Sequence, residues 1–195
     1  MKRAFDVTVS LAGLGLLWPL FSVIALALWL TSGGPVLFVQ ERAGRRGRPF
    51  RLLKFRTMAV LQGAENGLFE PGSRARVTPF GRILRAYKID ELPQLWNVLR
   101  GEMSLVGPRP EIRKWVEAFP DRWSRILSVK PGITDPASVV YRHEEEILAG
   151  SSDPDETYRS EVLPHKLTLY EDYVQNRTFW GDIRIVLLTI AKIAG

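Results

Sequence analysis

The chain has 195 residues, of which 46% are hydrophobic and 25% charged, with 27 Lys and Arg against 21 Asp and Glu. This length suits one domain with a sizeable core, and the averages exclude a disordered, collagen-like or disulfide-stapled protein. Because the chain has no cysteine, thiol catalysis and Cys-based zinc or iron–sulfur sites are also excluded. Its two histidines leave little room for a His-rich metal centre.

Charge is distributed unevenly along the chain. Residues 1–40 carry a net charge of +1, residues 41–100 hold 13 basic and 5 acidic side chains for +8, and residues 101–195 carry −3. No charged residue lies between Val7 and Gln40. An apolar head followed by a basic block is typical of a protein that is held at an anionic membrane or binds an anionic substrate.

The apolar segment Leu11–Leu30 contains a single polar side chain, that of Ser22. At ~1.5 Å per residue, a helix of this length just crosses a hydrocarbon core of about 30 Å. The segment is too long for the apolar part of a signal peptide, and no convincing small-residue cleavage site follows it. The simplest interpretation is therefore a straight transmembrane helix.

Two observations favour a helix that is broken inside the membrane. Pro19 lies near the middle of the segment, where it removes one backbone donor and clashes with the carbonyl of Gly15. Both flanks of the segment are basic, and the positive-inside tendency would place both on the cytoplasmic side. A re-entrant helix that enters and leaves through one leaflet satisfies both observations. From these residues alone, the re-entrant and the spanning helix are equal alternatives.

Short strands and then helices follow in chain order. Two strands, Val36–Gln40 and Phe50–Phe55, flank a turn rich in Gly and Arg. Residues 61–79 indicate a polar loop, and the acidic residues 144–157 indicate another. The predicted helices are Gly81–Tyr87, Leu92–Leu99, Glu111–Phe119, Val162–Val174 and Asp182–Ile193.

Some apolar side chains recur at helical spacing or lie close together in the chain. Helix Leu92–Leu99 is expected to end at Gly101 and to have Leu92, Leu95, Trp96 and Leu99 on one face. The last helix has an apolar face made of Ile183, Val186, Leu187, Ile190 and Ile193, and a separate aromatic group consists of Trp115, Phe119 and Trp123. For most residues of the last helix and of the aromatic group, core packing is the preferred interpretation, and a membrane interface is the alternative.

A pair of adjacent carboxylates, Asp90 and Glu91, precedes helix Leu92–Leu99. With Pro93 in the first turn, Asp90 is expected to cap that helix, and a plain capping role is the common explanation for such an Asp. The same position also allows chemistry. An ionised Asp can attack phosphorus to give an acyl phosphate, and two adjacent carboxylates can hold Mg²⁺ against a diphosphate.

Basic side chains that could bind phosphate are spread around this pair in the sequence. They are Lys54, Arg56, Arg85, Lys88, Arg109, Lys130 and Arg142. Prolines on both sides of Arg109 limit its backbone freedom, which suits a fixed guanidinium. Each cation alone is more often a surface residue or an ion-pair partner. Together with a carboxylate pair they predict phosphoryl transfer, whereas the Arg42–Arg56 run predicts lipid contact and no nucleic-acid binding.

Short motifs are distributed along almost the whole chain. They are residues 2–6 (KRAFD), the proline-broken apolar segment, and residues 34–42 (GPVLFVQER), 54–58 (KFRTM), 90–99 (DELPQLWNVL), 103–111 (MSLVGPRPE) and 130–134 (KPGIT). Together these motifs resemble those of the bacterial sugar transferases, the monotopic phosphoglycosyl transferases that start glycoconjugate assembly on a polyprenol phosphate. Their number and order make the resemblance specific.

The resemblance implies an α/β fold that is mainly helical with a short β-hairpin. It implies a re-entrant membrane helix at residues 1–34, broken at Pro19, with a cytoplasmic catalytic domain at residues 35–195 that has amphipathic interfacial helices. The expected location is the bacterial inner membrane. The start of the sequence is typical of the short form of the family, without a further membrane-spanning domain. A homodimer is compatible with this architecture.

The resemblance also implies a reaction. Asp90 would be the nucleophile on the β-phosphate of a UDP-sugar, UMP would leave, and polyprenol (undecaprenyl) phosphate would accept the phosphosugar. Glu91 matches the second carboxylate, and Mg²⁺, held by Asp90 and Glu91, is the expected cofactor. The basic positions associated with the phosphates are Lys54, Arg56, Arg85, Arg109 and Arg142, and Asp182 matches an acid expected to be structural.

The chain departs from the family pattern at residues 135–138, where it has Asp-Pro-Ala-Ser instead of Gly-Leu-Ala-Gln or Gly-Trp-Ala-Gln. This departure leaves the carboxylate pair intact but concerns the sugar pocket, so no sugar is predicted. Two other classes of function are compatible with the motifs. A basic membrane-binding protein without catalysis would not need Asp90, and a membrane-tethered hydrolase of nucleotide sugars would release UMP without a lipid product.

Overall fold

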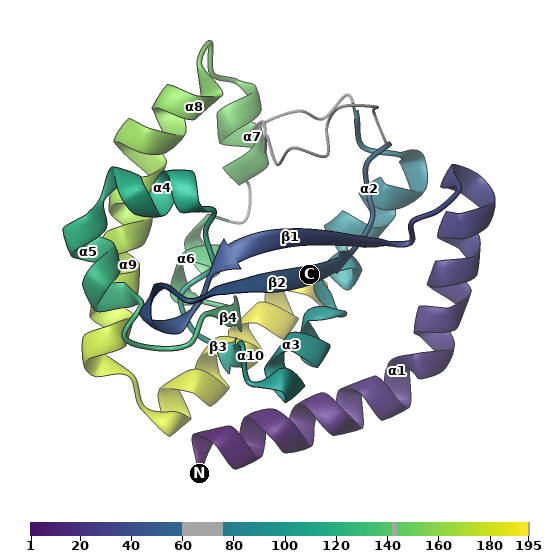
Figure 1. The fold of residues 1–195 in the computed structure, drawn as a ribbon, viewed down its shortest axis with the longest axis horizontal. Coiled ribbons are helices and arrows are strands. Elements are labelled where there is room, and N and C mark those ends of the chain that lie inside the picture. Colours follow the sequence, from purple (N-terminus) through teal and green to yellow (C-terminus); the bar gives the residue numbers. More distant parts are fainter. Residues whose placement is uncertain (60–75, 142–143, 195) are drawn as a thin grey trace.

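The computed structural model describes residues 1–59, 76–141 and 144–194 (Figure 1). The longer helices are α1 (Lys2–Ser32), α2 (Pro79–Ala86), α3 (Gln94–Arg100), α5 (Pro120–Ile126), α9 (Leu163–Asn176) and α10 (Phe179–Ala194). Shorter ones are η1 (Arg45–Gly47), η4 (Ile89–Glu91), α4 (Arg113–Ala118), α6 (Pro136–Val140), α7 (Glu144–Ala149), α8 (Pro154–Thr157) and η5 (Tyr158–Val162). The mainly helical content and the hairpin confirm the prediction, while most of the predicted loop at 61–79 lies outside the described residues.

Helix α1 contains Pro19 near its middle and is bent into two arms (Figure 1). A proline inside a helix removes one backbone hydrogen bond and crowds the preceding turn, which accounts for the bend. The mean hydropathy of its most apolar stretch is 2.2, and only 11% of that stretch is buried. Among the described residues, α1 is the one helix long and apolar enough to cross a membrane.

The N-terminal end of α1 is fastened to the rest of the protein by buried polar contacts. The carboxylate of Asp6 accepts hydrogen bonds from the hydroxyl of Ser104 (2.8 Å) and from the backbone N–H of Leu105 (3.3 Å). Lys2 forms an ion pair with Asp182 of α10. The first residues of the chain thus fix the start of α1, and Asp182 has the structural role expected of it.

The C-terminal arm of α1 contacts the same body through apolar side chains. Ile24 and Leu28 are buried against Phe55, at the end of β2 (Pro49–Phe55), and against Leu84 of α2. Both arms of the bent helix therefore rest on one folded unit.

Strands β1 (Leu37–Ala43) and β2 form the predicted antiparallel hairpin, longer than expected at the turn. The register pairs Phe38 with Lys54 at the open end, while η1 forms the tip. Lys54 is thus presented near the C-terminal end of β2.

A second, parallel sheet of β3 (Ser104–Val106) and β4 (Gly132–Thr134) was not predicted from the sequence. At Gly132, the first residue of β4, the backbone approaches that of Gly107 so closely that a Cβ atom at Gly132 would lie 2.1 Å from the nitrogen of Gly107. The N–H of Gly107 donates to the carbonyl of Thr134 (3.1 Å), and that of Gly132 donates to the carbonyl of Pro108 (3.0 Å). This junction fixes the start of the segment 107–110.

The predicted aromatic group lies in the largest core cluster. Trp115 and Trp123 are buried, together with Tyr158, Leu163 and Tyr170 from η5 and α9. Core packing is therefore confirmed for both tryptophans.

The prediction of an acidic loop at residues 144–157 is wrong, because α7 and α8 occupy most of it. The side chain of Asp153 accepts a hydrogen bond from the N–H of Glu156 (3.0 Å) and caps α8, with Pro154 in the first turn. Local capping and packing of Leu148 in the core outweigh the high charge of the segment.

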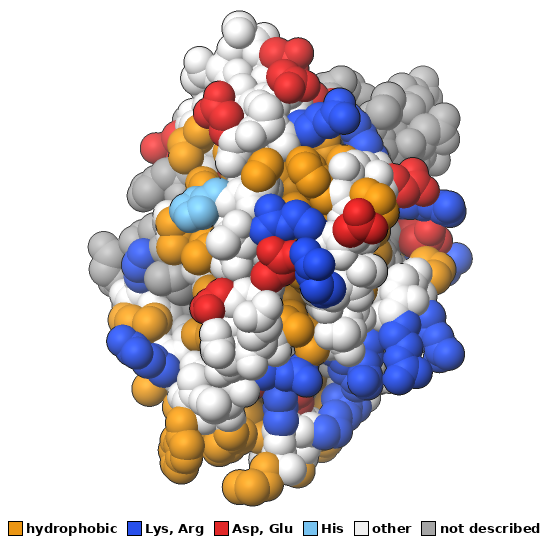
Figure 2. Space-filling model, turned by 90° about the vertical axis from the view of Figure 1, so that its left-hand side faces the viewer, with side chains coloured by type: hydrophobic (Ala, Val, Ile, Leu, Met, Phe, Trp, Pro, Cys, Tyr) orange, Lys and Arg blue, Asp and Glu red, His pale blue; other side chains and the backbone are white. Residues whose placement is uncertain are grey.

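The faces predicted for two helices are partly wrong. Trp96 of α3 is exposed, whereas Asn97 is buried, its amide donating to the carbonyl of Arg51 (2.7 Å). In α10, Leu187 and Ile190 are exposed, so core packing is wrong for them. In Figure 2, hydrophobic side chains gather at the lower edge, at the height of the N-terminal arm of α1 in Figure 1, and Lys and Arg lie above them. An apolar edge next to basic side chains is typical of an interfacial surface.

Replacing Gly132 by Ala is expected to destabilise the protein by about 3 kcal/mol, because the added Cβ would overlap the backbone of Gly107. Urea unfolding of the detergent-solubilised protein measures this. Gly15→Ala is the matched control, since a Cβ there meets no atom within 4 Å. Equal unfolding midpoints for the two variants would contradict the role of this junction.

Candidate active site

Asp90 and Glu91 lie in η4, a short turn between α2 and α3. The prediction that Asp90 caps the following helix is wrong, because α3 begins at Gln94 with Pro93 as its N-cap residue. The turn begins at Lys88, whose backbone is left-handed (φ 55°), and the N–H of Glu91 donates to the carbonyl of Lys88 (3.2 Å). Both carboxylates are buried, each with 6% of the residue exposed.

Glu91 is held by two cations from different parts of the chain. Its Oε1 lies 2.8 Å from Nζ of Lys54 and 2.6 Å from a guanidinium nitrogen of Arg109, and a second Arg109 nitrogen lies 3.4 Å from Oε2. Burial would raise the pKa of Glu91, but Arg109 and Lys54 together hold this pKa well below its usual value. Glu91 is therefore an ionised carboxylate with both oxygens engaged.

Asp90 has a different environment although it is the next residue in the chain. Its Oδ1 is buried and has no hydrogen-bond partner in the described part of the protein. Burial, with repulsion from Glu91, raises the pKa of Asp90 to about 6, against the opposing effect of Lys54, Lys88 and Arg85. An unpartnered carboxylate oxygen with a raised pKa, surrounded by cations, is typical of a functional group.

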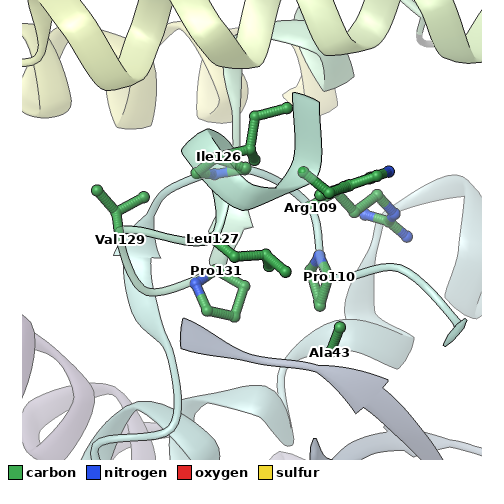
Figure 3. Close-up of a pocket in the computed structure, with 9 residues that line it drawn as sticks. Ala43, Arg109, Pro110, Ile126, Leu127, Val129 and Pro131 are labelled. Atoms are coloured by element: carbon green, nitrogen blue, oxygen red, sulfur yellow. The ribbon is translucent and has the colours of Figure 1, made fainter. Parts of the chain in front are cut away.

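Arg109 lies on the segment 107–110, which the Gly107–Gly132 junction and two prolines hold in place. The ionised Glu91 raises the pKa of Arg109 well above its usual value, so the guanidinium stays charged. Figure 3 shows Arg109 and Pro110 beside a crevice lined mainly by apolar side chains, among them Ile126 and Pro131. The lining of this crevice packs the segment against its neighbours, and Arg109 is the cation beside it.

Helix α2 brings Arg85 close to the carboxylate pair. Thr78 caps the helix by accepting from the N–H of Gly81 (3.0 Å), and Gly81 lies so close to Thr57 that a Cβ would be 2.2 Å from its carbonyl oxygen. Arg85 donates from Nε to the hydroxyl of Thr57 (2.9 Å), and its charge lowers the pKa of Asp90.

One predicted phosphate-binding residue, Arg56, is not brought into this cluster. Arg56 donates from its terminal nitrogens to the carbonyls of Ser32 (2.9 Å), Gly33 and Gly34 (3.0 Å), and so binds the end of α1. Arg142 lies outside the described residues. The cluster therefore contains Asp90, Glu91, Lys54, Arg85 and Arg109 among the predicted site residues.

A second buried polar cluster was missed from the sequence. Glu111 accepts from the hydroxyl of Tyr158 (2.6 Å) and forms an ion pair with Arg42 (3.3 Å), while Lys166 pairs with Glu144 (2.9 Å). The motif position of Glu111 next to Pro110 is the only sequence signal for it. This cluster supports the segment that carries Arg109.

The carboxylate pair fits Mg²⁺ in part. No group of three or more His, Cys, Asp or Glu side chains able to hold a metal occurs among the described residues. Mg²⁺, however, is often bound by one or two carboxylates together with substrate phosphates and water. The buried, unpartnered Oδ1 of Asp90 could serve as one such carboxylate ligand, whereas both oxygens of Glu91 already contact cations.

Comparisons with known proteins agree with the motifs. The family described as bacterial sugar transferase matches residues 1–195. A protein of Aeromonas hydrophila, named UDP-N-acetylgalactosamine-undecaprenyl-phosphate N-acetylgalactosaminephosphotransferase, is 36% identical over 99% of this chain. A Caulobacter vibrioides protein, named UDP-glucose:undecaprenyl-phosphate glucose-1-phosphate transferase, is 38% identical over 98%.

These relatives differ from this chain in length. The chain spans 43% of the Aeromonas protein and 69% of the Caulobacter protein. It spans 87% of a sugar transferase of Bacillus subtilis, with which it is 35% identical. The match of the family to every residue from 1 to 195 places the chain in the bacterial sugar transferase family.

Proposed function

We propose that this protein transfers a sugar 1-phosphate from a UDP-sugar to polyprenol (undecaprenyl) phosphate through a covalent intermediate on Asp90. The observation that carries the proposal is the buried, unpartnered Oδ1 of Asp90, next to a carboxylate whose oxygens are both engaged. The names of the relatives support the donor and acceptor classes. Those names contain two different sugars, so the proposal specifies a UDP-sugar and no particular sugar.

The reaction has two displacements at the same phosphorus. In the first, an Asp90 oxygen forms a bond to the β-phosphorus, the bond from that phosphorus to the bridging oxygen breaks, and UMP leaves with this oxygen. In the second, a phosphate oxygen of the polyprenol phosphate attacks the same phosphorus, and the acyl phosphate bond breaks. Asp90 is thereby regenerated as a carboxylate, and the product is a polyprenyl-diphospho-sugar.

Electrostatics assigns different roles to the two carboxylates. Asp90 becomes the nucleophile when it is ionised, and a pKa of about 6 leaves it largely ionised at neutral pH. Glu91 binds Lys54 and Arg109 and so holds both cations near Asp90. The N–H groups of these cations that do not bind Glu91 can stabilise negative charge on the phosphates. Asp90 would hold Mg²⁺ through its unpartnered oxygen, and the ion would supply positive charge to the diphosphate.

We infer that α1 is re-entrant and holds the catalytic body at the cytoplasmic face of the bacterial inner membrane. Divided at Pro19, its arms are about 25 and 20 Å long at 1.5 Å per residue, each shorter than a hydrocarbon core of about 30 Å. Both arms contact the same body, through Asp6 at one end and Leu28 at the other. The exposed apolar side chains of α10 support a position at the interface.

Purified protein mixed with a UDP-sugar and Mg²⁺, without lipid, is expected to gain the mass of a phosphosugar, because Asp90 completes the first displacement alone. Intact-mass spectrometry measures this gain. Asp90→Asn is expected to lose it, while Asp121→Asn, at an exposed carboxylate, retains it. UMP release that requires lipid, without an adduct, would contradict the covalent route, and UMP release without any lipid product would favour a hydrolase.

Asp90→Asn is expected to stabilise the protein at pH 7.5 by about 1–3 kcal/mol. The pKa of Asp90 is about 6 when folded and lower when unfolded, so ionising it costs stability as pH rises from about 4 to 6. The gain should therefore be full above pH 6 and vanish near pH 4 in urea unfolding experiments. Glu91→Gln is the contrast, expected to cost about 3–5 kcal/mol by leaving Lys54 and Arg109 unpaired. A loss of stability in Asp90→Asn at pH 7.5 would contradict the raised pKa of Asp90.

Single cysteines at Ala4 and Arg48 are expected to react with a membrane-impermeant thiol reagent from the same side of the membrane. The native chain has no cysteine, so the background is clear, and both positions are exposed. A cysteine at Leu16, 79% exposed in the isolated protein, should be protected by lipid. Labelling of the two outer positions from opposite sides would rule out the re-entrant helix.

A further inference from the structure

The cations near the carboxylate pair differ in what they already bind. Lys54 and Arg109 are engaged with Glu91, Arg56 with carbonyls at the end of α1, and Arg85 with Thr57. Lys88 is exposed, and its side chain forms no hydrogen bond or ion pair with any residue that the structure describes. It is thus a cation in the turn of the nucleophile that remains available to a ligand.

The backbone of Lys88 is in an unfavourable conformation. Its φ of 55° and ψ of 19° lie in the left-handed region, where the Cβ of an ordinary residue is crowded and Gly is preferred. Its N–H donates to the carbonyl of Arg85 (3.0 Å), which ends α2 and reverses the chain into η4. Because glycine would be more stable at this position, the presence of a lysine indicates that its side chain has a function.

The charge of Lys88 acts on both carboxylates. It lowers the pKa of Asp90 alongside Lys54 and Arg85, and it lowers that of Glu91 alongside Arg109 and Lys54. Lysine carries a compact charge on a flexible stem, which suits contact with a phosphate that changes position during a reaction. Of these cations, Lys88 combines closeness to Asp90 with an exposed ammonium.

We propose that Lys88 is a substrate-binding residue whose ammonium binds an oxygen of the phosphate that approaches Asp90. This inference rests on the proposed function, because it takes Asp90 as the reacting group. The ligand chemistry is a phosphate monoester or diphosphate, supplied by the nucleotide sugar, the polyprenol phosphate or both in turn. Lys88 forms no covalent bond and supplies charge and hydrogen-bond donors to the phosphate.

The test separates the charge of Lys88 from its backbone strain. Lys88→Gly removes both, Lys88→Arg keeps the charge, and Arg46→Gly is a matched control. Arg46 is the other non-glycine residue with positive φ (60°) in the described chain, and it lies at the hairpin tip, at the opposite end of the strands from Lys54. Each variant is assayed in detergent with UDP-glucose and UDP-N-acetylgalactosamine in turn, and with undecaprenyl phosphate as acceptor.

Lys88→Gly is expected to melt at a higher temperature than the unchanged protein, yet to lose about ten- to hundredfold in kcat/KM, mainly through KM. Lys88→Arg should recover most of that loss. Arg46→Gly should also melt higher but keep its kinetics.

The two KM values identify the source of the phosphate. A rise confined to the KM of the UDP-sugar assigns Lys88 to the donor, and one confined to undecaprenyl phosphate assigns it to the acceptor. Unchanged KM values for both substrates in Lys88→Gly overturn the proposal. Failure of the covalent mechanism is seen separately, as the absence of an adduct in the unchanged protein, and the two KM values test Lys88 in that case as well.

Discussion

The rest of the site depends on the ion pairs that the carboxylate of Glu91 forms with Lys54 and Arg109. They join three segments that are distant in the sequence, since Lys54 comes from β2, Glu91 from η4 and Arg109 from the segment 107–110. Removing one partner of a buried ion pair leaves the other charge uncompensated, which lowers the stability of the protein by about 3–5 kcal/mol. The hairpin, the turn and the glycine junction must therefore assemble together. Features that look unrelated in sequence, such as the contact of Gly107 with Gly132, serve to bring Arg109 to Glu91.

The same interaction gives the two neighbouring carboxylates opposite properties. Lys54 and Arg109 compensate the charge of Glu91, whereas Asp90 is buried beside that charge with an oxygen that has no partner among the described residues. The fold thus disfavours the ionised form of Asp90. A ligand or reaction that engages this oxygen relieves the cost, which is how a stable scaffold can hold a reactive group.

The motifs contain residues that the fold brings together, whereas hydrophobic periodicity missed part of the fold. Asp90, Glu91, Lys54 and Arg109 are brought together as expected, but the three-residue strands β3 and β4 are too short to show any hydrophobic alternation. At residues 144–157 the high charge concealed helical signals that were present, namely the cap at Asp153 and Pro154 after it. For Arg56, its place beside Lys54 in one motif did not reveal that it binds carbonyls at the end of α1. Neighbours in sequence share a motif, but only tertiary packing decides which of them share a site.

The C-terminal arm of α1 is attached to the protein close to the carboxylate pair. Arg56 binds the carbonyls that follow the helix, Phe55 beside it packs on Ile24 and Leu28, and Lys54 one residue earlier binds Glu91. Consecutive residues at the end of β2 therefore contact α1 on one side and the carboxylate pair on the other. Under the proposed re-entrant insertion of α1, this short connection would fix the height of Asp90 relative to the lipid surface. The proposed lipid acceptor and soluble donor could then reach the same carboxylate in turn without any large movement of the protein.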